Sequence, residues 1–224
     1  MIKYNSIFNN NTLNIFTDAS VYKNENETIG APGFVAVIGE NIVEQKSIIL
    51  RESTNNESEL YAVNMAIQYA LQNRDKIEII NIFSDSQFAI FGLREWIFNW
   101  INNIKDDKLY NSSGRQVANQ SIFMNIIYTI LSNNLNISFY HNRGHFKNSQ
   151  VKEFINLFTK HNFLNDYIDF KSAYKIIYYN SIVDNNTRAL LHEIENFPNK
   201  LELPIYVARN DLDLEYYKKL LNIV

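Results

Sequence analysis

The segment that most restricts the fold is a nearly continuous β-branched run at 77–83, Ile-Glu-Ile-Ile-Asn-Ile-Phe. Such a run is typical of a central parallel strand, because a strand covered on both faces needs apolar side chains on both. Before it, Leu60, Val63 and Ile67 recur at helical spacing and predict an amphipathic helix over about 57–73. A helix leading into a buried strand favours an α/β fold.

The first fifty residues predict an antiparallel meander. Residues 13–18 alternate apolar and polar side chains, and 34–39 and 43–50 form two further strand-like runs. The connection at 20–33 carries Gly30, Pro32 and Gly33, so we expect a hairpin-type loop there.

The rest of the first 145 residues completes the pattern. We expect a helix over 86–99, a polar loop over 102–116, a helix over about 117–132 and a fifth strand at 135–140. The order βββ-α-β-α-α-β predicts a mixed five-stranded sheet flanked by helices. Beyond it, helix-like aromatic segments occupy 150–161 and about 171–196.

Composition excludes several classes of protein. The 224 residues are 46% hydrophobic, enough for one full core, and the absence of cysteine excludes disulfides and Cys-ligated zinc. The net charge of −3 argues against a protein that binds nucleic acid by bulk charge alone. It does not exclude a nuclease, because metal-binding carboxylates would themselves add negative charge that bound cations offset. Without a secretory signal or a run of about 20 apolar residues, we expect a soluble, cytoplasmic protein that does not enter membranes.

Four acids lie at informative places along this pattern. Asp18 ends the first strand, Asp85 follows the fourth, Glu59 lies in the first turn of a helix, and Asp184 lies far downstream in Asn-Ser-Ile-Val-Asp. Clustered carboxylates repel one another unless cations hold them together, so convergence of these side chains would imply a divalent metal site. The structural alternatives are a helix-start acid for Glu59 and a helix N-cap for Asp85.

The motifs around these acids resemble those of type 1 ribonuclease H, in the same order and without a large gap over about 12–147. They are Phe-Thr-Asp-Ala-Ser at 16–20, Thr-Asn-Asn-Glu-Ser-Glu-Leu at 54–60, Asp-Ser-Gln-Phe at 85–88 with Trp-Ile-Phe-Asn-Trp at 96–100, Val-Ala-Asn-Gln at 117–120, and His-Asn-Arg-Gly-His at 141–145. The resemblance implies a ribonuclease H-like fold and endonucleolytic hydrolysis of the RNA strand of RNA–DNA hybrids, leaving 5′-phosphate and 3′-hydroxyl ends.

The resemblance also implies two Mg²⁺ ions, with Mn²⁺ as an alternative, at the four acids. Asp18 would bridge both ions, Asp85 would be a shared or nearly shared ligand, and Asp184 and Glu59 would each complete one ion's site. His145 would assist proton transfer or product release.

The fourth acid departs from the family pattern. The family places it about ten residues after the Gly-His turn, where this chain has Ile155. Asp184 restores the expected Asn-x-x-x-Asp context, so we expect a helical insertion at about 148–175 before the last core helix. Glu153 is the alternative fourth ligand, although it lacks the preceding asparagine.

Substrate-binding positions also carry over from the resemblance. Side-chain amides would form hydrogen bonds in the minor groove, and a threonine and an asparagine would hold a DNA phosphate. Aromatic rings would pack on DNA sugars, which lack a 2′-hydroxyl. These predicted nucleic-acid-binding residues are Asn55 and Asn56, Thr54 and Asn119, Phe88 and Trp96, together with Ser86 of the Asp-Ser-Gln motif.

We expect a catalytic domain over 1–196 and a C-terminal extension over 197–224 that could mediate an interaction of an otherwise monomeric protein. Two other functions compete. A 3′–5′ exonuclease of the DEDD type shares the sheet but needs an acid where the chain has Ser20. A non-catalytic nucleic-acid- or protein-binding module on the same scaffold is the second alternative, because the fourth acid is displaced.

Overall fold

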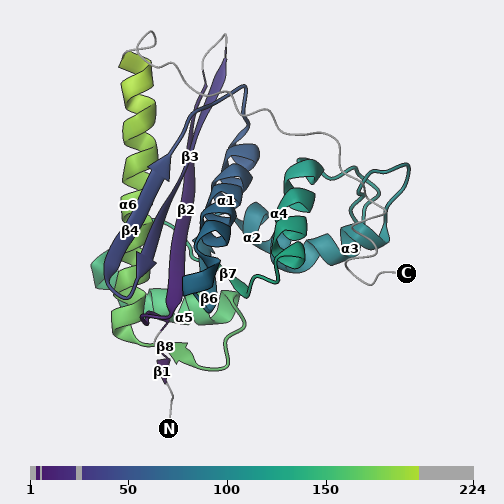
Figure 1. The fold of residues 1–224 in the computed structure, drawn as a ribbon. Helices are drawn as coiled ribbons and strands as arrows, with labels where there is room; N and C mark the ends of the chain where they lie inside the picture. Colours follow the sequence, from purple (N-terminus) through teal and green to yellow (C-terminus); the bar gives the residue numbers. More distant parts are fainter. Residues whose placement is uncertain (1–3, 6, 24–26, 197–224) are drawn as a thin grey trace.

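The computed structural model describes residues 4–5, 7–23 and 27–196. The predicted C-terminal extension, 197–224, lies outside these residues. Within them, a mixed sheet has the strand order β4-β3-β2-β6-β7, and short β5 also pairs with β3. The predicted α/β fold with five main strands is confirmed (Figure 1). No helix in the described part of the chain is long and apolar enough to cross a membrane.

The sheet has an antiparallel half and a parallel half. Its antiparallel strands are β2 (Thr12–Lys23), β3 (Thr28–Ile38), β4 (Asn41–Ser47) and β5 (Leu50–Arg51). Strands β6 (Ile79–Ser84) and β7 (Ile137–His141) follow in parallel with β2. A separate two-stranded sheet pairs β1 (Tyr4–Asn5) with β8 (Tyr167–Ile168).

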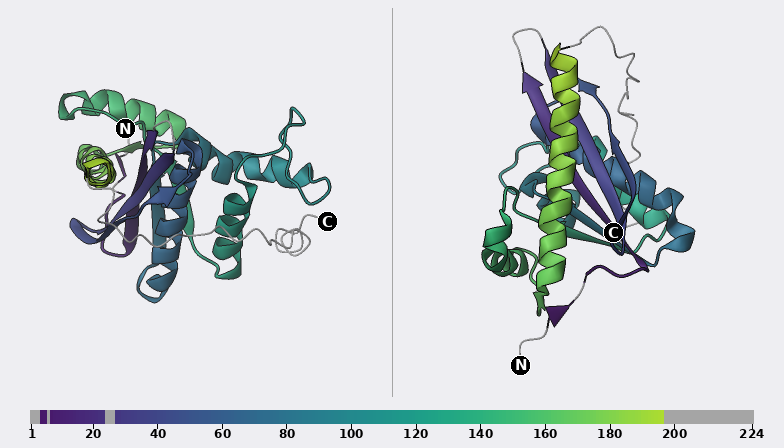
Figure 2. Two further views of the ribbon diagram at one scale, coloured as in Figure 1. Left: turned by 90° about the horizontal axis from the view of Figure 1, so that it is seen from above. Right: turned by 90° about the vertical axis from the view of Figure 1, so that its left-hand side faces the viewer.

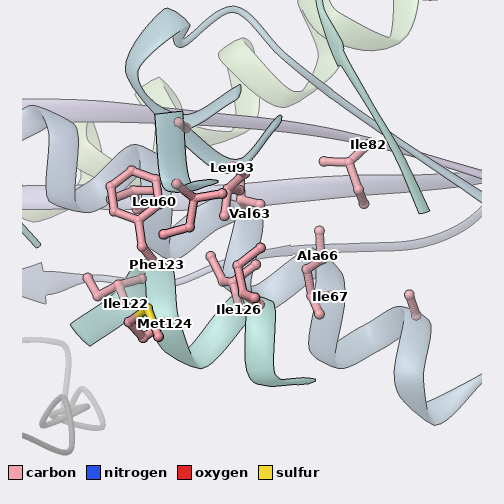
Figure 3. Close-up of a cluster of buried hydrophobic side chains, with 14 of the residues drawn as sticks. Leu60, Val63, Ala66, Ile67, Ile82, Leu93, Ile122, Phe123, Met124 and Ile126 are labelled. Carbon is pink, nitrogen blue, oxygen red and sulfur yellow. The ribbon is translucent and has the colours of Figure 1, made fainter. Parts of the chain in front are cut away.

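Helices cover both faces of the sheet (Figure 2). On one face, α1 (Asn55–Gln72) and α4 (Gln120–Ser132) pack with the helical segment formed by α2 (Gln87–Phe91), the π-helical turn η2 (Gly92–Trp96) and α3 (Ile97–Asn102). Figure 3 shows Leu60 and Val63 of α1 among Leu93, Phe123 and Ile126 in this core. Burial of such a cluster is the main stabilising contribution to this face.

The opposite face is covered by α5 (Val151–His161) and α6 (Phe170–Asn196), with short 3₁₀ turns at Arg74–Lys76 and Asn148–Gln150 elsewhere. Its core is aromatic: Phe16 stacks on Phe83 with ring centroids 4.7 Å apart, and Phe154 and Phe158 pack in the same cluster. The segment that we expected to be inserted thus contributes α5 and the start of α6 to a second core.

The expectation of a loop over 20–33 is wrong. Strands β2 and β3 stay paired from Leu13↔Ile38 out to Lys23↔Thr28, so Gly30, Pro32 and Gly33 all lie within β3. The glycines permit close approach of helices: a Cβ on Gly30 would overlap the Ser58 hydroxyl of α1, and one on Gly33 would overlap Ser47 and lie 2.9 Å from Thr187 of α6. Glycine inside a strand here reflects packing rather than a turn.

Candidate active site

Three carboxylates meet at one edge of the sheet. Thr17 of β2 pairs with Ser84 of β6 in parallel register, so Asp18 and Asp85, the next residue in each chain segment, are neighbours. Glu59 reaches the same place from α1. One oxygen of each of the three carboxylates lies within 4.8 Å of the others.

The two structural alternatives for these acids do not fit the structure. The N-cap of α2 is Ser86, which accepts a hydrogen bond from Ala89 N, so Asp85 has no capping role. Helix α1 begins two residues earlier than predicted, and its first-turn acid is Glu57, which forms a capping box with Thr54. Glu59 is the buried fifth residue of the helix, 6% exposed.

Asp184, rather than Glu153, joins the three acids. It lies on α6 and lines a cavity of about 540 Å³ together with Asp18, Glu59 and Asp85, and its charge contributes to the raised pKa of Asp18. Glu153 lies exposed on α5, where it accepts a hydrogen bond from Gln150 Nε2, and it does not line this cavity.

Burial and mutual repulsion raise the pKa values of these acids. Desolvation, followed by repulsion from Asp85 and Asp184, raises the pKa of Asp18 to about 7. Desolvation, followed by the charges of Asp18 and Asp85, raises the pKa of Glu59 well above its usual range. Desolvation also raises the pKa of Asp85, although His145 opposes the rise. Such a cluster favours either protons or a cation.

A divalent cation fits the cluster. The Oε2 atom of Glu59 is buried and has no hydrogen-bond partner in the described part of the chain, which is costly for a carboxylate oxygen without a ligand. The donor set consists of carboxylate oxygens, the ligands that Mg²⁺ and other hard cations prefer.

The turn after β7 brings His145 to the cavity. His145 lines it with a left-handed backbone, φ 62°, and Gly144 lies so close to Asp85 that a Cβ there would overlap the carboxylate. His141, the last residue of β7, places its Nε2 atom 3.1 Å from the backbone carbonyl oxygen of Asp85. The turn and the end of β6 are thus held against each other.

A side chain makes strand-like hydrogen bonds to β7, which is the edge strand of the sheet among the described residues. The amide of Asn162, at the end of α5, donates to His141 O (2.9 Å) and accepts from His141 N (2.8 Å), as a neighbouring strand would. Arg94 donates to the same Asn162 oxygen (3.0 Å). Asn142, next in the chain, donates to Asn180 of α6 (2.7 Å), one helical turn before Asp184. Sequence patterns did not indicate these links, because each joins residues distant in sequence.

The predicted nucleic-acid-binding residues lie outside the acid cluster. Thr54 is the N-cap of α1, with Asn55 and Asn56 exposed beside it, and Asn119 is the N-cap of α4 with φ 57°. Phe88 and Trp96, the latter 37% exposed, line a second cavity of about 440 Å³ that also contains Arg115. Ser86 begins α2 directly after Asp85.

The raised pKa values predict how stability depends on pH and metal. The unfolded chain has ordinary carboxyl pKa values, so between about pH 4 and pH 7 the folded protein binds more protons than the unfolded one. Without metal, the free energy of unfolding should therefore fall as pH rises from about 4 to about 7 and level off above the pKa of Asp18, with a total loss of up to about 4 kcal/mol from this residue.

Urea unfolding in chelator from pH 5 to pH 8 checks this dependence. Saturating Mg²⁺ should remove most of the loss, and Asp18→Asn should make the metal-free dependence shallower. Stability that rises with pH between 5 and 8 in chelator would contradict the account of the cluster.

Comparisons with known proteins agree with this geometry. The model of the RNase H family matches residues 10–163. A ribonuclease H of Neorickettsia sennetsu is 32% identical over 114 residues, which span 50% of this chain and 68% of the relative. A ribonuclease HI of Haemophilus influenzae is 34% identical over 125 residues, 55% of this chain and 73% of the relative.

A solved structure supports the fold. The solution structure of the PFV RNase H domain superposes with a TM-score of 0.52 at 19% identity, covering 72% of this chain and 94% of that domain. At this identity the likeness concerns the fold alone.

Proposed function

The chain belongs to the ribonuclease H family, and we propose that it hydrolyses the RNA strand of RNA–DNA hybrids with divalent metal ions held by four acids. The observation that carries the proposal is the convergence of Asp18, Glu59 and Asp85 within 4.8 Å, with Asp184 in the same cavity. A non-catalytic module would have no reason to bear the cost of burying these carboxylates together.

The four acids would divide the metal ligation among them. Asp18, whose charge interacts with those of Asp85, Asp184 and Glu59, would contact both ions, Asp85 one or both, and Asp184 and Glu59 one each. When bound, the ions supply charge neutralisation at the scissile phosphate and a more acidic attacking water. In-line attack would leave 5′-phosphate and 3′-hydroxyl ends.

The protein's own residues would position the substrate and exchange protons. His145 lies at the cavity on a turn held by Gly144 and His141, so its imidazole could pass a proton to or from the departing product. Thr54 and Asn119 would hold a phosphate of the DNA strand, and Asn55 and Asn56 would hydrogen-bond in the minor groove.

Discrimination between the strands would come from shape. Phe88 and Trp96 share a cavity separate from the acids, and their rings would pack on deoxyribose where a 2′-hydroxyl would clash. Ser86 follows Asp85 directly in the chain and precedes Phe88 by two positions. Its side chain would therefore lie near the sugar–phosphate backbone of the bound hybrid. The hybrid is thus held by its DNA strand and cleaved on its RNA strand.

A strand-resolved assay tests this proposal. One hybrid is labelled at the 5′ end of its RNA strand and, in a second preparation, at the 5′ end of its DNA strand, and both are incubated with the protein and Mg²⁺. We expect internal cleavage of the RNA strand alone, with products that a 3′-hydroxyl-dependent polymerase can extend. Cleavage of the DNA strand, or products with blocked 3′ ends, would contradict the proposed specificity or chemistry.

A further inference from the structure

The backbone carbonyl of Asp85 lies between two regular elements and belongs to neither. The pairing of β6 with β7 ends with Ser84↔His141. The hydrogen-bond ladder of α2 begins at the carbonyl of Ser86, which accepts from Ile90 N at 3.1 Å. A main-chain carbonyl that no helix or strand pairs takes its hydrogen bond from a side chain or from water. For Asp85 the partner is the His141 ring, and because a carbonyl oxygen only accepts, Nε2 carries the proton and donates.

This hydrogen bond orients the carboxylate of Asp85. It fixes the peptide plane that follows Asp85 and thereby the backbone torsion angle next to its side chain. The carboxylate also packs closely on Gly144, where a Cβ would lie 2.4 Å from Asp85 Oδ2. A shift at the end of β7 would therefore move this carboxylate relative to Asp18 and Glu59.

Asn162 holds the end of β7, and it does more than the other asparagines at helix ends. Several helices of this chain end in an asparagine whose Nδ2 atom donates to the carbonyl four residues earlier, at 2.8 to 2.9 Å. These are Asn73, Asn103 and Asn133. Asn162 makes the same bond to Phe158 O (2.9 Å), so this bond alone explains an asparagine at the end of α5.

The remaining bonds of Asn162 are the ones that a helix end does not need. Its Nδ2 also donates to His141 O, and its Oδ1 accepts from His141 N and from Arg94 Nη1. An asparagine amide has two N–H donors and two acceptor lone pairs, so four bonds saturate it. The residue is 9% exposed, which leaves little access for water to replace a lost bond. Three of the four bonds tie α5 and Arg94 to the last residue of β7.

We propose that Asn162 and His141 are positioning residues for the metal site. Asn162 fixes the end of β7 against α5, and His141 transmits this position to the backbone of Asp85. The inference rests on the proposed function, since it concerns the alignment of Asp85 toward a metal ion. Neither residue is among those that line the acid cavity, so both act through Asp85. Replacing residues that support metal ligands in this way typically costs about 10- to 100-fold in metal affinity or activity.

Calorimetric titration with Mn²⁺ tests the role of His141 without catalysis. His141→Gln keeps an N–H donor near the place of Nε2, because a glutamine amide reaches as far as that ring atom, whereas His141→Phe keeps a ring and loses the donor. We expect His141→Phe to bind Mn²⁺ about 10- to 100-fold more weakly than wild type, and His141→Gln to recover most of the affinity. Equal losses in the two variants would overturn the proposal.

The matched control for Asn162→Ala is Asn133→Ala. Asn133 ends α4 and accepts from Arg74 Nη1 (2.9 Å), as Asn162 ends α5 and accepts from Arg94, but its partners lie on α4 and the turn Arg74–Lys76 instead of on β7. We expect Asn162→Ala to weaken Mn²⁺ binding about tenfold or more, and Asn133→Ala to leave it unchanged. Combining Asn162→Ala with His141→Phe should cost little more than His141→Phe alone, because coupled residues are not additive.

Hybrid cleavage at a fixed, subsaturating Mg²⁺ concentration completes the test. Asn162→Ala should lower kcat with little change in KM for the hybrid, and saturating Mg²⁺ should restore most of the rate. Mn²⁺ affinity equal to that of Asn133→Ala, or fully additive losses with His141→Phe, would overturn the positioning role. Should Asn162→Ala prove unfolded in a urea titration, the two His141 variants decide the outcome. Failure of wild type to cleave any hybrid would instead overturn the proposed function, so the two failures are distinguishable.

Discussion

Replacing Asp85 with asparagine is expected to lower the rate of RNA-strand hydrolysis by about 1,000-fold, which corresponds to about 4 kcal/mol of lost transition-state stabilisation. Asp85 follows β6 and lies with Asp18 and Glu59 in one group of carboxylates. An amide has one neutral carbonyl oxygen where the carboxylate offers two charged ones, so metal affinity and charge neutralisation both decrease.

The same substitution should leave the protein folded. Because it removes one repelling charge from a buried cluster, the metal-free variant should unfold at the same or a higher temperature than wild type. Asp75→Asn, which changes an acid that is 95% exposed, is the matched control and should keep wild-type activity. Initial rates on a labelled hybrid measure the effect, and activity within tenfold of wild type would exclude Asp85 as a metal ligand.

Asp184→Asn should lower the rate by about 100-fold, and Glu153→Gln should have no effect. Asp184 lines the acid cavity and its charge contributes to the raised pKa of Asp18, whereas Glu153 lies exposed on α5. The expected loss is smaller than for Asp85 because Asp184 lies outside the three mutually closest carboxylates.

A measurement of metal binding distinguishes the loss of a metal ligand in Asp184→Asn from a general effect of the substitution on the structure. Calorimetric titration with Mn²⁺ should show weaker or fewer bound ions for Asp184→Asn, with the Glu153→Gln titration identical to wild type. If Glu153→Gln were inactive and Asp184→Asn fully active, the fourth ligand would be Glu153, and α5 would have to rearrange on metal binding.

The order of the elements was predictable because each depends on a local period. The β-branched run at 77–83 became β6, and the helical spacing of Leu60 and Val63 became α1. The region 20–33 was not predictable in this way. Gly30 and Gly33 are glycines because side chains of α1, β4 and α6 approach them, and that reason exists only in the folded chain.

The acids were easier to identify than their neighbours for a similar reason. Asp18 and Asp85 follow strands whose parallel pairing places them together, so the sequence alone indicated their convergence. The bridge from Asn162 to His141 had no such signal, because a side-chain amide and a strand backbone 21 positions apart are joined only in the folded chain.

The most direct test is the cleavage of three duplexes by the wild-type protein. Labelled RNA–DNA hybrid, duplex RNA and duplex DNA are incubated in parallel with Mg²⁺, with Mn²⁺ and with chelator. The same incubations with Asp85→Asn measure the background cleavage. Rapid internal cleavage of the hybrid's RNA strand only in the presence of metal, with neither of the other duplexes cut, is the result that the four-acid site predicts. An intact hybrid under every metal condition, or equal cleavage in chelator, would contradict it.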